Sequence, residues 1–259
     1  MSQLELALDA DVSAKHLSFV ETGRSAPSRE MVLHLAEQLD VPLRERNVLL
    51  IAAGFAPLFR ERPLEDPALD AARRAVDLVL AGHEPHPALA IDRHWNLVAA
   101  NRAVMALLAG AAPSLLQAPV NVLRLSLHPD GVAPRIVNLA EWRAHLFARL
   151  RHQIELTADP MLSELMRELS EYPSTGGEGP NVAERDYAGV VVPLRFVSPA
   201  GILSFISTTT VFGTPVDITL SELALESFFP ADAATAETLR RLAEERERVE
   251  VAERARRAA

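Results

Sequence analysis

The first 56 residues carry apolar side chains at intervals of three and four, which is the period of short amphipathic helices. Four such helices are predicted, the last over about Leu43–Ala53. The side chains of Ser2 and Ser13 are placed to cap the first two helices, and the third helix starts at Ser28. The pattern predicts an all-α module over residues 1–58, and a linker with three prolines over residues 57–69.

Residues 70–232 alternate between helical and strand patterns. Helices are predicted over residues 70–82, Asn101–Leu108, Leu139–Thr157 and Leu162–Leu169. Strand-like runs lie at Pro87–Ile91, Trp95–Ala100, Gly189–Phe196, Ile202–Phe212 and Val216–Thr219, with a flexible loop at Ser174–Pro180. The first two runs form a hairpin and the last three a meander, on either side of a helical middle. This order predicts a mixed α+β domain whose antiparallel sheet covers helices.

Residues 233–259 form one charged helix with a thin apolar stripe at Leu239, Leu242, Val249 and Ala252. Its Glu and Arg residues pair at i,i+4 spacing, and each such pair contributes only about 0.2–0.5 kcal/mol. A solvated tail helix is the first interpretation. Docking of this helix across a dimer is the alternative.

Composition limits the class of protein. The chain has 259 residues, of which 49% are hydrophobic and 24% charged, as in soluble proteins of one large or two modest domains. It has no cysteine, which excludes disulfides, thiolate-bound zinc and a thiol nucleophile. The longest uncharged apolar run, near Ala103–Pro113, is too short for the roughly 20 residues that a bilayer requires. The N-terminus has no basic region before an apolar run, so we expect a cytoplasmic protein without membrane contact.

Charge argues against nucleic acid bound along the whole chain, because the net charge is −9. One segment differs: residues 12–29 hold Lys15, Arg24 and Arg29 against Glu21, a local net charge of +2. Two short helices joined by a tight turn also lie here, as in a helix-turn-helix that projects its second helix into the major groove.

This segment resembles the phage-repressor (XRE, lambda-repressor-like) helix-turn-helix family. The resemblance is carried by Ser2–Ala7, Val12-Ser13, Val20–Arg24, Pro27-Ser28 and Leu35–Val41, and most specifically by the run Ser13–Ser28. It implies a partner in double-stranded DNA. Base-reading positions would be Ala14, Lys15, His16 and Phe19, with phosphate contacts from Gln3, Arg24 and Ser28. Phe19 would contact a thymine methyl group or belong to the core.

Members of this family carry a helix ahead of the one that matches Gln3. We therefore expect that this first helix is missing here, either because the true start lies upstream of Met1 or because the bundle is incomplete. In its absence Leu4, Leu17 and Leu35 are expected to lose part of their packing surface. The interpretation without DNA is a four-helix module that binds another protein.

The larger domain resembles the MmyB-like ligand-binding domain, a PAS-like fold that follows an XRE module in one chain. The matching segments are His94–Asn101, Asn121–Gly131, Asn138–Trp142, Phe212–Asp217 and Glu226–Asp232. With the helix-turn-helix, the resemblance covers about Met1–Leu242. It implies a transcription regulator that senses a small apolar, fatty-acid-like molecule and needs no other cofactor.

Candidate ligand-binding residues follow from this resemblance. An apolar cavity would be lined by Trp142, Leu146, Leu150, Leu194, Phe196, Leu203 and Phe205. An acidic head group would meet Arg124, His128 or Arg135. The alternative is that these apolar residues simply fill the core.

No catalytic arrangement is found, because the chain lacks a nucleophile elbow and the glycine patterns that hold nucleotides. No metal site is predicted either: His83-Glu84-Pro85-His86 has no third histidine nearby. The sequence therefore predicts a homodimeric, ligand-responsive DNA-binding regulator and not an enzyme. The alternative is an apolar-ligand-binding or interaction protein with a vestigial N-terminal bundle.

Overall fold

The computed structural model describes residues 2–173, 192–213, 215 and 217–258. The chain divides into two compact units. Unit 1 is formed by Met1–Asp70 together with Phe212–Glu222, and unit 2 by Ala71–Val211 together with Leu223–Ala259. The predicted loop Ser174–Pro180 lies outside the described residues.

Unit 1 contains the four predicted helices, which are α1 (Gln3–Asp9), α2 (Ala14–Glu21), α3 (Arg29–Gln38) and α4 (Leu43–Ala52). The caps predicted at Ser2 and Ser13 are confirmed, and Ser28, where the third helix was expected to start, is a cap as well. The Oγ atoms of Ser2, Ser13 and Ser28 accept hydrogen bonds from the backbone N–H three residues ahead, at 3.1–3.2 Å. The short helix η1 (Pro67–Leu69) ends the linker, and α10 (Ile218–Ser221) belongs to the second segment of the unit.

Two leucines of α1 lie outside the core of unit 1. Ala7 and Leu17 are buried, whereas Leu4 and Leu8 are 61% and 72% exposed, although both lie on the predicted apolar face of α1. The exposure of Leu4 agrees with the expectation for that residue, whereas the burial of Leu17 contradicts it. Leu35 is partly buried.

Unit 2 is built on one antiparallel sheet of five strands in the order β2-β1-β5-β4-β3. The strands are β1 (Ala88–Ile91), β2 (Leu97–Ala100), β3 (Leu194–Ser198), β4 (Gly201–Val211) and β5 (Ala224–Pro230). The helices are α5 (Asp70–Gly82), α6 (Arg102–Leu107), η2 (Pro113–Leu116), α7 (Val122–Leu127), η3 (Ala133–Arg135), α8 (Leu139–Thr157), α9 (Pro160–Glu171) and α11 (Ala233–Ala258). The predicted α+β class is confirmed.

One strand prediction was wrong. Of the segment predicted as the strand Val216–Thr219, Val216 lies outside the described residues, and Asp217 starts the helical turn α10, because its side chain accepts a hydrogen bond from the Thr219 N–H at 3.0 Å. The strand beside β4 is β5, which the sequence did not indicate. It pairs with β1 on its other side and so joins the hairpin to the rest of the sheet.

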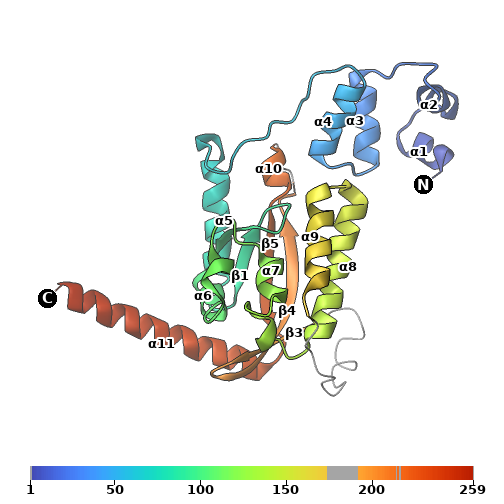
Figure 1. Cartoon of the computed structure of the whole chain (residues 1–259). Coiled ribbons are helices and arrows are strands. Elements are labelled where there is room, and N and C mark those ends of the chain that lie inside the picture. The colour runs from blue at the N-terminus through green and yellow to red at the C-terminus, as the bar shows by residue number, and fades with distance from the viewer. Residues whose placement is uncertain (1, 174–191, 214, 216, 259) are drawn as a thin grey trace. The chain divides into compact units, whose positions relative to one another are not determined.

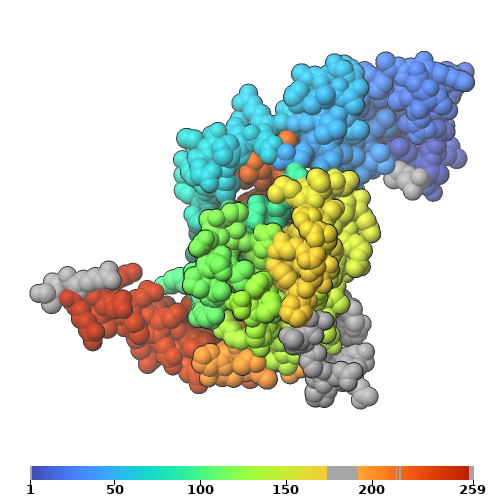
Figure 2. Space-filling view, in the orientation of Figure 1, coloured from blue at the N-terminus to red at the C-terminus, as the bar shows by residue number. Residues whose placement is uncertain are grey.

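The main core lies between the sheet and the long helices. Trp142, Leu146 and Leu150 of α8 pack with Phe196, Leu203 and Phe205 of the sheet. Figures 1 and 2 show α8 and α9 side by side, in direct contact along their length. On α6, Asn101 caps the first turn, as the predicted start at that residue requires.

Candidate functional site

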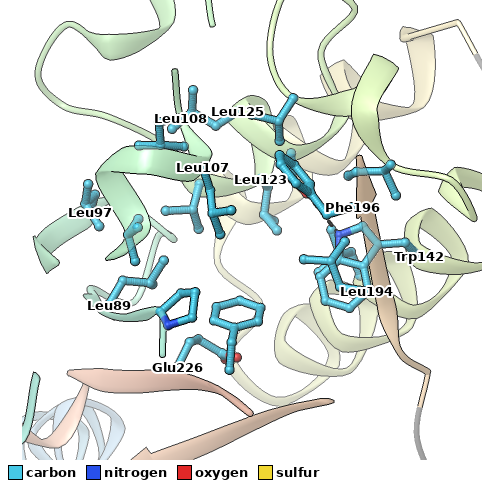
Figure 3. Close-up of a pocket in the computed structure, with 18 of the residues that line it drawn as sticks. Leu89, Leu97, Leu107, Leu108, Leu123, Leu125, Trp142, Leu194, Phe196 and Glu226 are labelled. Carbon is cyan, nitrogen blue, oxygen red and sulfur yellow. Dashed lines mark hydrogen bonds between the residues drawn. The ribbon is translucent and has the colours of Figure 1, made fainter. Parts of the chain in front are cut away.

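Unit 2 contains a partly open, apolar cavity of about 120 Å³ between the sheet and the helices α6, α7 and α8. Figure 3 shows side chains from these elements converging, with Leu89 and Leu97 on one side and Trp142, Leu194 and Phe196 opposite them. The other residues that line the cavity are Pro87, Trp95, Val104, Leu107, Leu108, Val122, Leu123, Leu125, Ser126, Val132, Ile136, Leu146, Arg149, Glu226 and Phe228. The site is thus a mostly apolar space with a few polar groups, as is usual for small-molecule sites.

The predicted apolar lining is brought together in part. Trp142, Leu146, Leu194 and Phe196 line the cavity. Leu150 and Phe205 are fully buried in the core but are not among the lining residues. Leu203 lies instead along a separate groove beside α11.

The residues predicted to hold an acidic head group lie outside this lining. The Arg124 guanidinium donates two hydrogen bonds to the Glu168 carboxylate, at 2.7 and 2.8 Å. The hydroxyl of Tyr172 also donates to Glu168, at 2.6 Å. His128 packs edge-on against the Tyr172 ring, with 4.9 Å between the ring centroids. These groups satisfy one another at the α7–α9 contact.

Arg135 touches the cavity wall from outside. Its guanidinium lies 4.5 Å from the centre of the Phe196 ring and donates to the Leu107 carbonyl. Phe196 and Leu107 both line the cavity, whereas Arg135 lines a shallower pocket next to it. Burial lowers the pKa of Arg135.

The charged residues that do line the cavity are Arg149 and Glu226, which form an ion pair. The Arg149 guanidinium also lies 4.8 Å from the centre of the Trp95 ring, a cation–π contact. Both residues were missed in the sequence. Arg149 could have been found, because on the predicted helix it lies three residues after Leu146 and seven after Trp142, on the same face. Glu226 lies on β5, the strand that was not predicted.

Trp95 is held in place by polar contacts on its far side. Its indole N–H donates to Gln153 Oε1 at 2.8 Å, and Gln153 Nε2 donates to the Arg93 carbonyl at 2.7 Å. Arg93 and His94 both pair with Asp159, which caps α9. Burial alone would raise the pKa of Asp159, but the bonds from Arg93, His94 and the Met161 N–H outweigh it and lower the pKa to about 2.

The size of the cavity limits what it accepts without movement. A volume of about 120 Å³ is below the roughly 300–1,000 Å³ of drug-sized ligand sites. It is close to the roughly 150 Å³ of an engineered apolar cavity that holds benzene. A ligand with about six heavy atoms therefore fits inside the space, whereas a longer one must extend out of its open part or displace the walls.

In unit 1, two cationic side chains lie near Phe19, one on α2 and one in the turn after it. Lys15 and Arg24 are exposed, and their charged ends lie 5.7 Å and 6.0 Å from the centre of the Phe19 ring. Phe19 itself is partly exposed, and Ala14 and His16 are also partly exposed on this helix. The predicted base-reading positions therefore share an accessible surface.

Two predicted phosphate contacts have partners within unit 1. Ser28 caps α3, and Gln3 Nε2 donates to the Glu21 carboxylate at the end of α2. Both residues are exposed, and backbone N–H groups at the start of α3 lie beside Ser28. The Gln3 bond ties α1 to α2, the two helices of the motif.

The segment between β4 and β5 is part of unit 1. Glu222, at the end of α10, accepts a hydrogen bond from Arg44 Nε of α4 at 2.7 Å. Arg44 Nη1 also donates to Glu61 at 2.8 Å, and these two carboxylates raise the pKa of Arg44. Asp217 is fully buried and pairs with Arg62 at 3.2 Å. The β4–β5 connector is thus fixed to α4 and to the linker.

Among the described residues, no group of three or more His, Asp or Glu side chains is placed to hold a metal ion. No described helix combines the length and apolar character needed to cross a bilayer.

Family comparisons match both parts of the chain. Residues 72–242 match the family described as the MmyB-like transcription regulator ligand binding domain. Residues 1–46 match a helix-turn-helix family. No curated protein matches the chain at a significant level.

Proposed function

The chain belongs to the MmyB-like transcription regulators and combines a helix-turn-helix with their ligand-binding domain, and from this premise we propose that it is a sequence-specific regulator whose DNA affinity responds to a small apolar ligand. The observation that carries the proposal is the presence, on one chain, of two exposed cationic side chains beside Phe19 on the helix-turn-helix and of an apolar cavity in the second unit. Each is the feature that its partner, DNA or an apolar molecule, requires.

On the DNA side, α2 is the recognition helix. Ala14, Lys15, His16 and Phe19 reach base edges, and Arg24 neutralises a phosphate. Lys15 and Arg24 both lie within about 6 Å of the Phe19 ring, which is partly exposed and contacts a thymine methyl group. Gln3 and Ser28 contact the phosphate backbone at either end of the motif.

The regulator acts as a homodimer. A single helix of this size reads only a few base pairs, and two copies read half-sites about 34 Å apart, one turn of the duplex. The operator is therefore expected to be a palindrome with its halves about ten base pairs apart.

The β4–β5 connector supports a route from ligand to DNA. Glu226 and Phe228 line the cavity on β5, and the chain just before β5 is fixed to α4 through Glu222 and Arg44. A ligand that displaces β5 changes the strain on this connector. The ligand alters DNA affinity only to the extent that it binds the two arrangements with different affinity.

DNA binding is tested by anisotropy titrations of a fluorescent random-sequence duplex pool with the full chain at several salt concentrations. Lys15→Ala and Arg24→Ala should each weaken binding, and loss of one phosphate contact should lower the slope of log affinity against log salt by about 0.9. Arg167→Ala is the matched control, since it removes one exposed positive charge from α9. Equal binding by all variants would favour the alternative of an interaction protein with a vestigial bundle.

Ligand binding is tested by native mass spectrometry of the freshly purified chain, followed by organic extraction. An apolar adduct that is lost in a Leu146→Trp variant, which fills the cavity, would support the proposal. Absence of an adduct, together with no thermal shift on adding six-carbon alcohols or acids, would count against ligand binding at this cavity.

A further inference from the structure

We propose that two copies of the chain associate through the groove between α11 and α6, with the α11 helices of the two copies packed antiparallel. The inference rests on the proposed function, because it locates the contact through which the proposed homodimer forms. In this arrangement α11 docks across the dimer instead of lying alone in solvent.

α11 is closely packed only at its beginning. It contacts β4 and β5, and its buried residues among those described are Thr235 and Leu239, both in its first two turns. Figure 1 shows the helix beginning beside the sheet and extending away from it. Because most helical stability comes from packing against other elements, the remaining part of α11 gains from a partner.

A groove of about 770 Å³ runs along this part of the helix. Its other wall is α6, and the turn between β3 and β4 lies at its side. The apolar residues that line it are Ala103, Ala106 and Leu107 of α6, Pro199, Ala200 and Leu203 of the β3–β4 hairpin, and Leu239, Leu242 and Val249 of α11. Val249 is 58% exposed, so part of this apolar surface faces water until a partner covers it.

The charges that line the groove complement a second copy of the same helix. Arg241 and Glu245 lie one helical turn apart along one edge of the apolar stripe of α11. Arg246 and Glu250 lie likewise along the other edge. When two such helices pack antiparallel about a two-fold axis, the same edge of each helix faces its copy. Each edge runs from arginine to glutamate, so the reversed copy sets Arg241 opposite the partner's Glu245.

This balance of charge favours a second copy over a strongly charged partner such as DNA. The residues of α11 that line the groove include two arginines and two glutamates, so their charges cancel. A second copy brings the same apolar stripe and the same alternation of charge, and each contact between them occurs twice.

The test measures the mass of the full chain by sedimentation equilibrium at micromolar concentrations. We expect the wild type to reach twice the 28.3 kDa of one chain. Arg241→Glu and Glu245→Arg should each weaken association at least about tenfold, because each sets like charges opposite one another at two symmetric places. Both residues are exposed, so neither substitution disturbs the core of one copy.

A mixture of these two variants tests the pairing directly. In a mixed dimer, the two glutamates of one copy face the two arginines of the other. An equal mixture of Arg241→Glu and Glu245→Arg should therefore regain the association that each lacks alone. The matched controls are Glu244→Arg and Arg248→Glu, which alter an exposed pair of α11 that is not among the lining residues of the groove. They should leave association unchanged.

Val249→Asp tests the apolar part of the contact. Because Val249 is exposed in one copy, the substitution leaves the fold intact but puts a charge inside the proposed interface, and association should weaken at least about tenfold. Val251→Asp is the control, since Val251 is 66% exposed and is not among the lining residues of the groove.

The outcomes are distinct. A wild-type chain that stays monomeric overturns both this inference and the proposed homodimer, but not DNA binding by α2. A wild-type dimer that persists in Arg241→Glu, Glu245→Arg and Val249→Asp overturns this inference alone, because the homodimer then forms through another surface. Weakened association of both charge variants without recovery in their mixture overturns the antiparallel pairing.

Discussion

The strongest electrostatic contact near the cavity is made by Asp159, and its replacement gives a prediction with a calculable size. Asp159 is buried at the start of α9, where it pairs with Arg93 and His94 and accepts a hydrogen bond from the Met161 N–H at 2.8 Å. Asp159→Asn keeps the size of the side chain and its ability to cap the helix, and it removes the charge. The variant therefore isolates the ionic contribution.

The magnitude follows from the pKa of Asp159, which is lowered from 3.8 to about 2. A lowered pKa means that the folded state favours the ionised form, so stability is gained above pH 3.8 and lost as the pH falls through 2. At about 1.4 kcal/mol per pH unit, the contribution at pH 7 is about 2 kcal/mol. At pH 3 about 1 kcal/mol of it remains.

The assay is urea denaturation of the wild type and Asp159→Asn between pH 7 and pH 3. We expect a difference in unfolding free energy of about 2 kcal/mol at neutral pH that narrows as the pH falls. Asp232→Asn is the control, because Asp232 caps α11 through the Thr235 N–H and forms no ion pair among the described residues. A difference that is independent of pH would refute the reasoning.

Two further predictions concern the frame of the cavity. Asn101→Ala should lower the free energy of unfolding by about 3 kcal/mol, as measured by urea denaturation. The reason is that the buried Asn101 side chain forms hydrogen bonds with the backbone of four residues, Leu80, His86, Ala88 and Val104. A change below about 1 kcal/mol would contradict this prediction. Gly131→Ala should lower the midpoint of thermal unfolding, because an added Cβ would lie 2.3 Å from the Leu125 carbonyl oxygen. Gly82→Ala is the control, since a Cβ added there meets no atom within 4 Å. An equal effect of the two substitutions would refute the clash at Gly131.

Local signals in the sequence predicted most of the helices, because their causes are local. Ser2, Ser13 and Ser28 cap helices through bonds that span three residues, and α5 and α8 have the predicted bounds. β5 was missed for a physical reason. The charged Glu226 is buried, and its partners, Arg149 and Thr209, lie 77 and 17 residues away in the chain.

Helical periodicity predicted the part of the candidate site that lies on α8. Trp142 and Leu146 line the cavity because they share one face of α8, and the same reasoning extends to Arg149. Arg124, which was expected to bind an acidic head group, already has a partner in Glu168. Nothing in the sequence indicated that these two residues lie close together. Pairing between distant segments decides which charges remain available to a ligand.

The most direct test of the account is selection of duplexes from a random-sequence library by the full chain, followed by sequencing. If α2 is the recognition helix of a homodimer, the selection should enrich a palindrome whose halves lie about one helical turn apart. A chain with both Lys15→Ala and Arg24→Ala should lose this enrichment, and a chain with both Arg167→Ala and Arg248→Ala, which removes two exposed charges from α9 and α11, should keep it. Selection of no common sequence by the wild type, or the same enrichment with all three chains, would contradict the assignment of α2 as the recognition helix.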